Sequence, residues 1–277
     1  MMTHQLVNKS VGIIGCGWLG RALAISLLEQ GIDVLATSSQ LENVKQLNQQ
    51  GIKANQLVLP ATTEQLARHK IFAQHALVIA ITPQFKQGRA DYAEKIAQLV
   101  AAATKIGKVQ RIILLSSTAI YTDLVGRVDE ASELSLSLNK VSMLHKAEQA
   151  VLSFNSKGTV IRLAGLVGPE RHPGKFILAN KTLSNATAPV NLIHQQDAVG
   201  LIESLLNSGN EQGVFNGVSD THVNKQNYYQ VAATALGLAA PIFSPTDSNQ
   251  RNRVVSGDKV KQILKYKFTY PDLLSWL

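Results

Sequence analysis

The chain has 277 residues, of which 45% are hydrophobic and 17% charged, as expected for one large α/β domain or for a domain with an added lobe. No apolar run reaches the roughly eighteen residues of a membrane-spanning helix, so the sequence predicts no membrane partner. The net charge of +8 is dispersed without a basic run, which argues against nucleic-acid binding and is compatible with a small, anionic partner.

The N-terminal sequence and the cysteine content predict a cytoplasmic protein. Residues 1–10 (MMTHQLVNKS) lack the apolar core and the small-residue cleavage site of a signal peptide. Cys16 is the only cysteine, so the chain can form no internal disulfide. No set of His, Cys, Asp and Glu residues has the spacing of metal ligands, and we therefore expect no metal site.

Short apolar runs alternate with helical patterns in the first part of the chain. We expect strands at 11–15, 33–37, 54–59, 76–82, 109–116 and 159–163. We expect helices at 19–30, 40–50, 89–106 and 139–154. Strands that alternate with helices of this length form βαβ units, so the sequence predicts an α/β fold with a doubly wound parallel sheet of the Rossmann type.

The sequence changes in character after Gly165. Residues 165–174 (GLVGPERHPG) contain prolines and glycines at a density that is typical of a loop. The elements expected after it are strands at 190–193, 214–216 and 253–256, helices at 197–207 and 223–236, and a polar linker at 244–252. Asp197 is expected as the N-cap of its helix. We therefore predict a Rossmann domain at 1–165 and a smaller C-terminal lobe at 166–277, with residues 190–216 returning in part to the first domain.

A glycine motif lies between the first expected strand and the first expected helix. Residues 15–20 (GCGWLG) match G-x-G-x-x-G, in which Gly15 allows a tight turn, Gly17 a close approach to a pyrophosphate, and Gly20 close packing of helix and strand. The first amides of the helix would face the phosphates. Its context favours an NAD(P) site over a glycine-rich turn without a ligand. The expected cofactor-binding residues of this motif are Gly15, Gly17, Trp18, Leu19 and Gly20.

The end of the second expected strand bears on the choice between NADP and NAD. In NAD-binding proteins, an acidic residue about 20 residues after the motif binds the ribose hydroxyls. This chain has Thr37, Ser38 and Ser39 there, whereas Asp33 lies at the opposite end of the strand. Hydroxyl groups can bind a 2′-phosphate that a carboxylate would repel, so the sequence favours NADP. Binding of the NAD ribose by Ser38 stays open as the alternative, because hydroxyl groups discriminate poorly between the two cofactors.

Two later strands also end in residues that we expect near a ligand. Ile81 and Thr82 end the fourth strand, and Ser116 and Ser117 end the fifth. Ligands of open α/β sheets bind at the carboxyl ends of the strands. We therefore expect Ile81, Thr82 and Ser116 to contact the cofactor.

Several segments resemble the extended short-chain dehydrogenase/reductase superfamily, the group of NAD-dependent epimerase/dehydratases. They are residues 116–121 (SSTAIY), Lys146 with Glu148, and residues 162–169 (RLAGLVGP). Segments that resemble the atypical, YeeZ-like branch more closely are 191–197, 215–220 and 268–272. The likeness extends over nearly the whole chain, and it implies a nicotinamide cofactor and a carbonyl or nucleotide-sugar-like substrate.

The superfamily's catalytic site consists of Ser, Tyr and Lys, with Tyr four residues before Lys. The resemblance places Ser at Ser117, Lys at Lys146, where it would also bind the nicotinamide ribose, and Tyr at Ser142. Ser142 is a poor general acid, because an aliphatic hydroxyl is far less acidic than a phenol with its pKa of about 10. Tyr121 or His145 could replace it, although Tyr121 is expected first as a wall of the substrate pocket and His145 as a packing or surface residue.

Replacement of the tyrosine leaves two functions open. The first is an NADP-linked oxidoreductase or epimerase, and the second is a non-catalytic NADP(H)-binding redox sensor or scaffold. The resemblance also implies a homodimer formed through helices 89–106 and 139–154, and the alanine-rich faces of these helices are compatible with such an interface.

Overall fold

A seven-stranded sheet is the central element of the computed structural model, which describes residues 10–154, 157–177, 182–208, 211–244 and 252–277. Its strands are β1 (Ser10–Ile14), β2 (Asp33–Ser38), β3 (Ala54–Gln56), β4 (Ala76–Ile79), β5 (Arg111–Ser117), β7 (Gly158–Leu163) and β10 (Gly213–Gly217). All neighbouring strands are parallel, in the order β10-β7-β5-β4-β1-β2-β3. Because β1 pairs with both β2 and β4, the winding reverses there, and the predicted doubly wound Rossmann-type sheet is confirmed.

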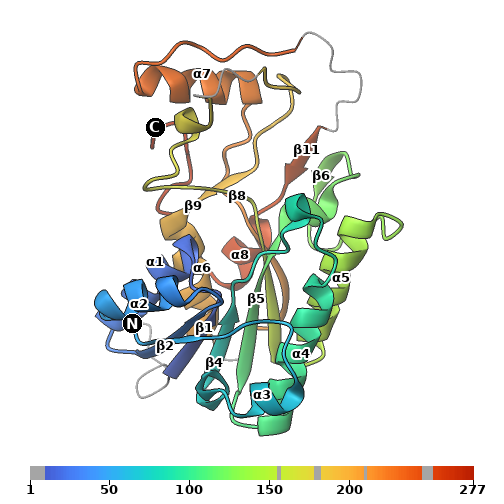
Figure 1. The fold of residues 1–277 in the computed structure, drawn as a ribbon. Coiled ribbons are helices and arrows are strands. Elements are labelled where there is room, and N and C mark those ends of the chain that lie inside the picture. The colour runs from blue at the N-terminus through green and yellow to red at the C-terminus, as the bar shows by residue number, and fades with distance from the viewer. Residues whose placement is uncertain (1–9, 155–156, 178–181, 209–210, 245–251) are drawn as a thin grey trace.

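Helices cover both faces of this sheet (Figure 1). The α-helices are α1 (Trp18–Glu29), α2 (Leu41–Gln49), α3 (Thr63–Ala67), α4 (Tyr92–Ile106), α5 (Asn139–Leu152), α6 (Gln195–Asn207), α7 (Lys225–Ala235) and α8 (Asp258–Ile263). The 3₁₀ helices are η1 (Lys70–Ala73), η2 (Phe85–Gln87), η3 (Thr118–Tyr121) and η4 (Pro173–Ile177). Helices α4 and α5 pack together on one face, and α1 packs against α6 on the other.

Two short parallel strand pairs lie beyond the carboxyl ends of the main strands (Figure 1). One pair is β6 (Gly126–Val128) with β11 (Arg253–Val255), and the other is β8 (Gly165–Val167) with β9 (Leu192–His194). Together with α7 and the C-terminal residues, they form a lobe above the sheet. The chain returns from this lobe through α6 and then β10, which pairs with β7 at the sheet edge, and returns again through α8, which contacts β10.

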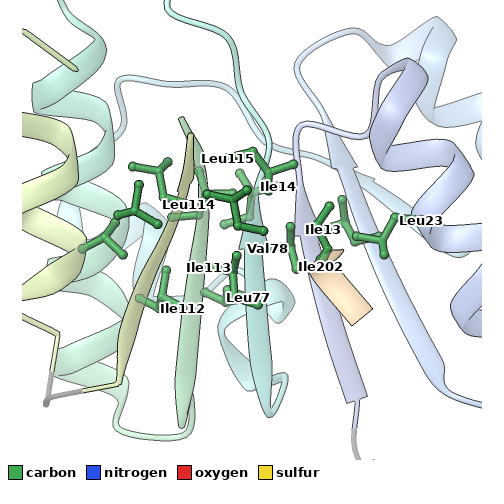
Figure 2. Packing of buried hydrophobic residues seen from close by; sticks show 14 of the residues in the cluster. Ile13, Ile14, Leu23, Leu77, Val78, Ile112, Ile113, Leu114, Leu115 and Ile202 are labelled. Carbon is green, nitrogen blue, oxygen red and sulfur yellow. The ribbon is translucent and has the colours of Figure 1, made fainter. Parts of the chain in front are cut away.

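The core beneath the lobe is formed by almost continuous apolar strands, as expected for a parallel sheet that is covered on both faces. Every residue of β4 is buried, as are all residues of β5 except the last. Figure 2 shows Ile13 of β1, Leu23 of α1 and Ile202 of α6 in this core. The close packing fixes the carboxyl ends of β1, β4 and β5 relative to one another.

Several predicted boundaries were wrong. Strand β3 ends at Gln56 and not at residue 59, and α4 begins at Tyr92 and not at residue 89. Residues 165–167, predicted as a loop, form β8, because their backbone pairs with β9 from a distant part of the chain. Strand β6 and helices α3 and α8 were not predicted. Most of the predicted linker, residues 245–251, lies outside the described residues.

Asp197 does not cap its helix. The N-cap of α6 is His194, whose Nδ1 accepts a hydrogen bond from the Gln196 amide at 3.2 Å. Asp197 is buried, and its carboxylate accepts hydrogen bonds from the amides of Thr269 (2.7 Å) and Tyr270 (2.9 Å). It therefore attaches the C-terminal segment to α6.

Candidate cofactor and substrate site

The three glycines of residues 15–20 satisfy three different steric demands. Gly15 has a φ of +90°, and a Cβ on it would lie 2.9 Å from the backbone nitrogen of Ile81. A Cβ on Gly20 would lie 3.2 Å from the Gly15 carbonyl oxygen, so Gly20 allows α1 to approach β1 closely. A Cβ on Gly17 would meet no atom within 4 Å. The space beside Gly17 is therefore open for a ligand at the N-terminus of α1.

Two cavities meet at this glycine loop. We call the first, of about 440 Å³, the β2-side cavity, because it is lined by the residues that follow β2 and β3. We call the second, of about 370 Å³, the β5-side cavity, because it is lined by the ends of β5 and β7. They share Gly15, Gly17, Ala80, Ile81 and Thr82. An extended ligand can therefore lie across the β1–β4 crevice with one end in each cavity.

Hydroxyl, amide and basic groups line the β2-side cavity. Thr37, Ser38 and Ser39 all lie in its wall, and the Ser38 Oγ accepts a hydrogen bond from the Gln40 amide at 3.2 Å. The wall also includes Arg89 and Lys95, which no sequence pattern indicated as ligand-binding. Its lining residues, all of them described, include no carboxylate.

Arg89 and Lys95 are held by one carboxylate outside the cavity wall. Asp91 forms ion pairs with Arg89 at 2.6 Å and with Lys95 at 3.0 Å. The two cations hold the pKa of Asp91 well below its usual range. The single negative charge of Asp91 thus balances only one of the two positive charges, so the wall formed by Arg89 and Lys95 keeps a net positive charge.

The β5-side cavity contains the serines that the sequence predicted near a ligand. Ser116 and Ser117 both line it. The Ser117 Oγ accepts a hydrogen bond from the Ala119 amide at 3.1 Å, which leaves its own proton to donate. The Ser116 Oγ instead donates to Glu148 at 2.6 Å. Ser117 is therefore the better placed of the two to bind a ligand oxygen.

Arg171 lines the same cavity from the loop after β8. Its guanidinium lies over the Trp18 ring, 4.2 Å from the ring centroid. The Trp18 Nε1 donates to the Pro169 carbonyl oxygen at 3.1 Å, and Gln195 Nε2 donates to the Trp18 carbonyl oxygen at 3.2 Å. These contacts connect the glycine loop to the lobe and orient Arg171 at the cavity.

A buried polar network lies behind the cavity. The Arg162 guanidinium donates to Glu148 at 2.7 Å and to the Tyr121 Oη at 2.7 Å, and the Tyr121 Oη donates to Asn216 at 2.9 Å. Tyr121 is fully buried, and burial raises its pKa. Tyr121 does not line either cavity, so its geometry favours a structural role over that of a pocket wall or an acid.

The candidate residues of α5 lie away from the two cavities. Glu148 faces the sheet, whereas Lys146, two residues earlier, is rotated by about 200° and is exposed. Ser142 and His145 are half-buried. Ser142, His145 and Lys146 all lie in the part of the chain that the structure describes, and none of them lines either cavity. The catalytic roles expected for Ser142 and Lys146 therefore gain no support from these positions.

The structure thus brings most of the residues predicted to bind the cofactor together at two joined cavities. The predicted residues that line one or both cavities are Gly15, Gly17, Trp18, Leu19, Gly20, Thr37, Ser38, Ser39, Ile81, Thr82, Ser116 and Ser117. Their arrangement fits a dinucleotide, with the open space at Gly17 beside the helix N-terminus for its pyrophosphate.

A family model described as NAD(P)H-binding matches residues 15–193. The chain belongs to this NAD(P)H-binding family. Protein YeeZ of Escherichia coli (strain K12) is 32% identical over 275 residues, which cover 96% of this chain and 98% of YeeZ. The predicted resemblance to YeeZ-like proteins is thereby confirmed.

Solved structures of the epimerase/dehydratase superfamily share the fold of this family member. WbmG of Bordetella bronchiseptica, an enzyme solved in complex with NAD, matches with a TM-score of 0.80 at 17% identity, over 98% of this chain and 93% of its own. UDP-N-acetylglucosamine 4-epimerase of Bacillus cereus matches with a TM-score of 0.74 at 17% identity, over 95% of each chain. Among the helices of the described residues, none is both long and apolar enough to cross a membrane.

Proposed function

We propose that the protein is an NAD(P)-dependent oxidoreductase or epimerase-like enzyme that acts on a carbonyl or nucleotide-sugar-like substrate. The observation that carries the proposal is the pair of joined cavities across the glycine loop, with Ser117 in the cavity beyond it. The cofactor, when bound, supplies hydride transfer at its nicotinamide. The chain's own part is to hold the pyrophosphate at Gly17 and to offer the Ser117 hydroxyl to a substrate oxygen.

NADP is the cofactor that the β2-side cavity favours. Its wall combines the hydroxyls of Thr37, Ser38 and Ser39 with the cations of Arg89 and Lys95. A 2′-phosphate would interact favourably with these groups, because charge-assisted hydrogen bonds to phosphate are strong. NAD stays the alternative, since the same hydroxyls can bind an unmodified ribose.

We further propose that the substrate is anionic. Arg171 is the charged side chain in the wall of the β5-side cavity, and within the described residues it forms no ion pair. Stacking on Trp18 restricts the guanidinium and leaves its N–H groups available to a carboxylate or phosphate.

The single cysteine and the cofactor support a cytoplasmic location as part of the proposal.

A non-catalytic redox sensor or scaffold is the second candidate function. It is favoured by one specific observation, namely that Lys146 and Ser142 do not reach the cavities. Trp18 contacts the loop at Pro169 and Arg171, so a movement of the glycine loop on cofactor binding would also move this part of the lobe.

The first experiment is a titration of the protein with NADPH and NADH, followed by nicotinamide fluorescence. We expect tight binding, with NADPH preferred by at least about tenfold, as for the loss of one charged hydrogen bond to phosphate. The Arg89→Gln variant should lower the affinity for NADPH and leave that for NADH unchanged. Lys53→Gln is the matched control, because Lys53 is an exposed cation that pairs with Asp33 outside the cavities. Equal affinity for both cofactors would remove the NADP proposal.

A second experiment separates the enzyme from the sensor. The NADPH-loaded protein is mixed with small 2-oxo acids and aldehydes. The NADP⁺-loaded protein is mixed with nucleotide sugars, because their epimerisation begins with hydride transfer from the sugar to the oxidised cofactor, and cofactor absorbance and sugar products are followed. Turnover of any compound that falls in the Arg171→Gln variant supports the enzyme with an anionic substrate. Tight cofactor binding without turnover of any compound in the panel would favour the sensor.

A further inference from the structure

Tyr92 places a phenol at the β5-side cavity, although no pattern in the sequence indicated it. Tyr92 is the first residue of α4, is 2% exposed, and lines the same cavity as Ser117 and Arg171. Its Oη is buried and has no hydrogen-bond partner within the described part of the chain. A buried hydroxyl that lacks a partner destabilises the fold, so its retention in a native protein calls for an explanation.

Packing does not explain the hydroxyl. The Tyr92 ring belongs to the main hydrophobic core, together with Ile96 and Leu99 of the same helix. A phenylalanine would supply the same ring without the unpaired oxygen. The hydroxyl therefore serves something other than the apolar core.

The protonation state of Tyr92 defines what its hydroxyl can do. Burial, and secondarily the negative charge of Glu148, raises the pKa of Tyr92 well above its usual value. The phenol therefore keeps its proton at neutral pH and acts as a hydrogen-bond donor. Glu148 does not take this proton, because its carboxylate is engaged by Arg162 and Ser116.

We propose that the Tyr92 Oη donates a hydrogen bond to a carbonyl oxygen that a ligand brings into the β5-side cavity. This inference rests on the proposed function and deepens it. Helix α4 would supply the phenol that the resemblance led us to expect on α5, at Ser142. The acceptor is either the carboxamide oxygen of the nicotinamide or the carbonyl oxygen of the substrate, which share the same chemistry.

The test compares Tyr92→Phe with Tyr228→Phe. Tyr228 is a matched control, because it is also fully buried with an unpartnered Oη, but lies on α7 in the second core cluster. Both variants lose an unsatisfied hydroxyl, so we expect both to unfold at a temperature no lower than that of the wild type. Only Tyr92→Phe should change ligand binding.

Three probes identify the acceptor by their affinities for wild type and both variants. They are NADPH, 2′-phospho-ADP-ribose, which lacks the nicotinamide, and oxaloacetate added to the NADPH-loaded protein. If the carboxamide is the acceptor, Tyr92→Phe weakens NADPH by about fivefold to tenfold and leaves 2′-phospho-ADP-ribose unchanged. If a substrate carbonyl is the acceptor, NADPH is unchanged and oxaloacetate is weakened by the same factor.

Other outcomes overturn the inference. The first is a Tyr92→Phe variant with wild-type affinity for both NADPH and oxaloacetate. The second is an equal loss of affinity in Tyr92→Phe and Tyr228→Phe. The third is a Tyr92→Phe variant that also loses affinity for 2′-phospho-ADP-ribose. Failure of the proposed function gives a different result. A wild type that binds neither NADPH nor NADH would lack the proposed cofactor site, and a wild type that binds NADPH but turns over no compound would fail as an enzyme, whereas the comparison of Tyr92→Phe with Tyr228→Phe measures binding alone.

Discussion

Gly15 and Gly17 occur in one loop, but substitution should affect them differently. In Gly15→Ala, the new Cβ would collide with the Ile81 backbone at a positive φ, so both stability and cofactor binding should be lost. In Gly17→Ala, the Cβ enters empty space in the free protein and would meet the pyrophosphate only when a cofactor binds. We predict an unchanged unfolding temperature and an NADPH affinity at least about tenfold lower for Gly17→Ala. Thermal unfolding with and without NADPH checks both, and a destabilised Gly17→Ala would contradict the assignment.

Cys16 gives a prediction for pH dependence. Burial raises the pKa of its thiol from the ordinary 9.0 to about 11. Between these values the folded protein keeps a proton that the unfolded chain loses, so this contribution to stability is complete below pH 9 and is lost as the pH rises towards 11. At pH 8 the native thiol should react with iodoacetamide about a hundredfold more slowly than in urea. A native rate that follows a pKa near 9 would contradict the prediction, and Cys16→Ala controls for labelling elsewhere.

At the residue scale, the sequence was informative wherever a side chain acts close to its own motif. The glycines, Thr37 and Ser117 line the cavities as expected, because their positions follow from local strand and helix ends. Arg89 and Tyr92 could not be predicted, because Arg89 lies in the loop before α4 and Tyr92 at the first residue of α4, and the tertiary packing of this segment brings them to the cavities. Lys146 lines neither cavity, because its motif match did not reveal which face of α5 it occupies, and its binding of the nicotinamide ribose stays a prediction.

At the scale of elements, the buried ion pair between Glu148 and Arg162 joins α5 to β7. Both side chains are almost fully buried, so Glu148→Gln leaves a guanidinium without its countercharge and should cost about 3–5 kcal/mol of unfolding free energy. The double variant Glu148→Met/Arg162→Met should lose less than the sum of its single changes. Urea denaturation measures each value.

The control for this pair is the exposed ion pair between Lys53 and Asp33. Asp33→Asn should cost no more than about 1 kcal/mol, because both side chains are well solvated. If Glu148→Gln costs no more than this control, the buried network does not stabilise the junction of α5 and β7.

Element prediction succeeded where periodicity is strong and failed where pairing is remote. All six early strands were located, because short apolar runs mark their positions along the chain. Strand β8 was missed, because glycine and proline mark a loop and its partner β9 comes much later in the chain. The role of Asp197 was wrong for the same reason, since its partners at 269 and 270 leave no local signal.

At the scale of the molecule, we predict a homodimer through α4 and α5. These helices pack side by side, and Ala97 and Ala101 on α4 are exposed to solvent. The wild type should elute at the mass of two chains in chromatography with light scattering, and Ala101→Glu should shift it to one chain, because two carboxylates would approach at the interface. Glu42→Ala, on the exposed side of α2, should leave the dimer intact. A monomeric wild type would contradict this assembly.

The return of α6 and β10 to the sheet has a consequence for how the protein is made. One side of α1 packs against α6, and the edge of β7 is paired by β10, so both contacts need residues beyond 194. The contacts of the Trp18 side chain with Pro169 and Arg171 also form only after these later residues have been synthesised. During synthesis, β7 therefore emerges from the ribosome with an open strand edge and α1 with one side uncovered, and the sheet that carries the glycine loop is completed only after residue 217 has emerged.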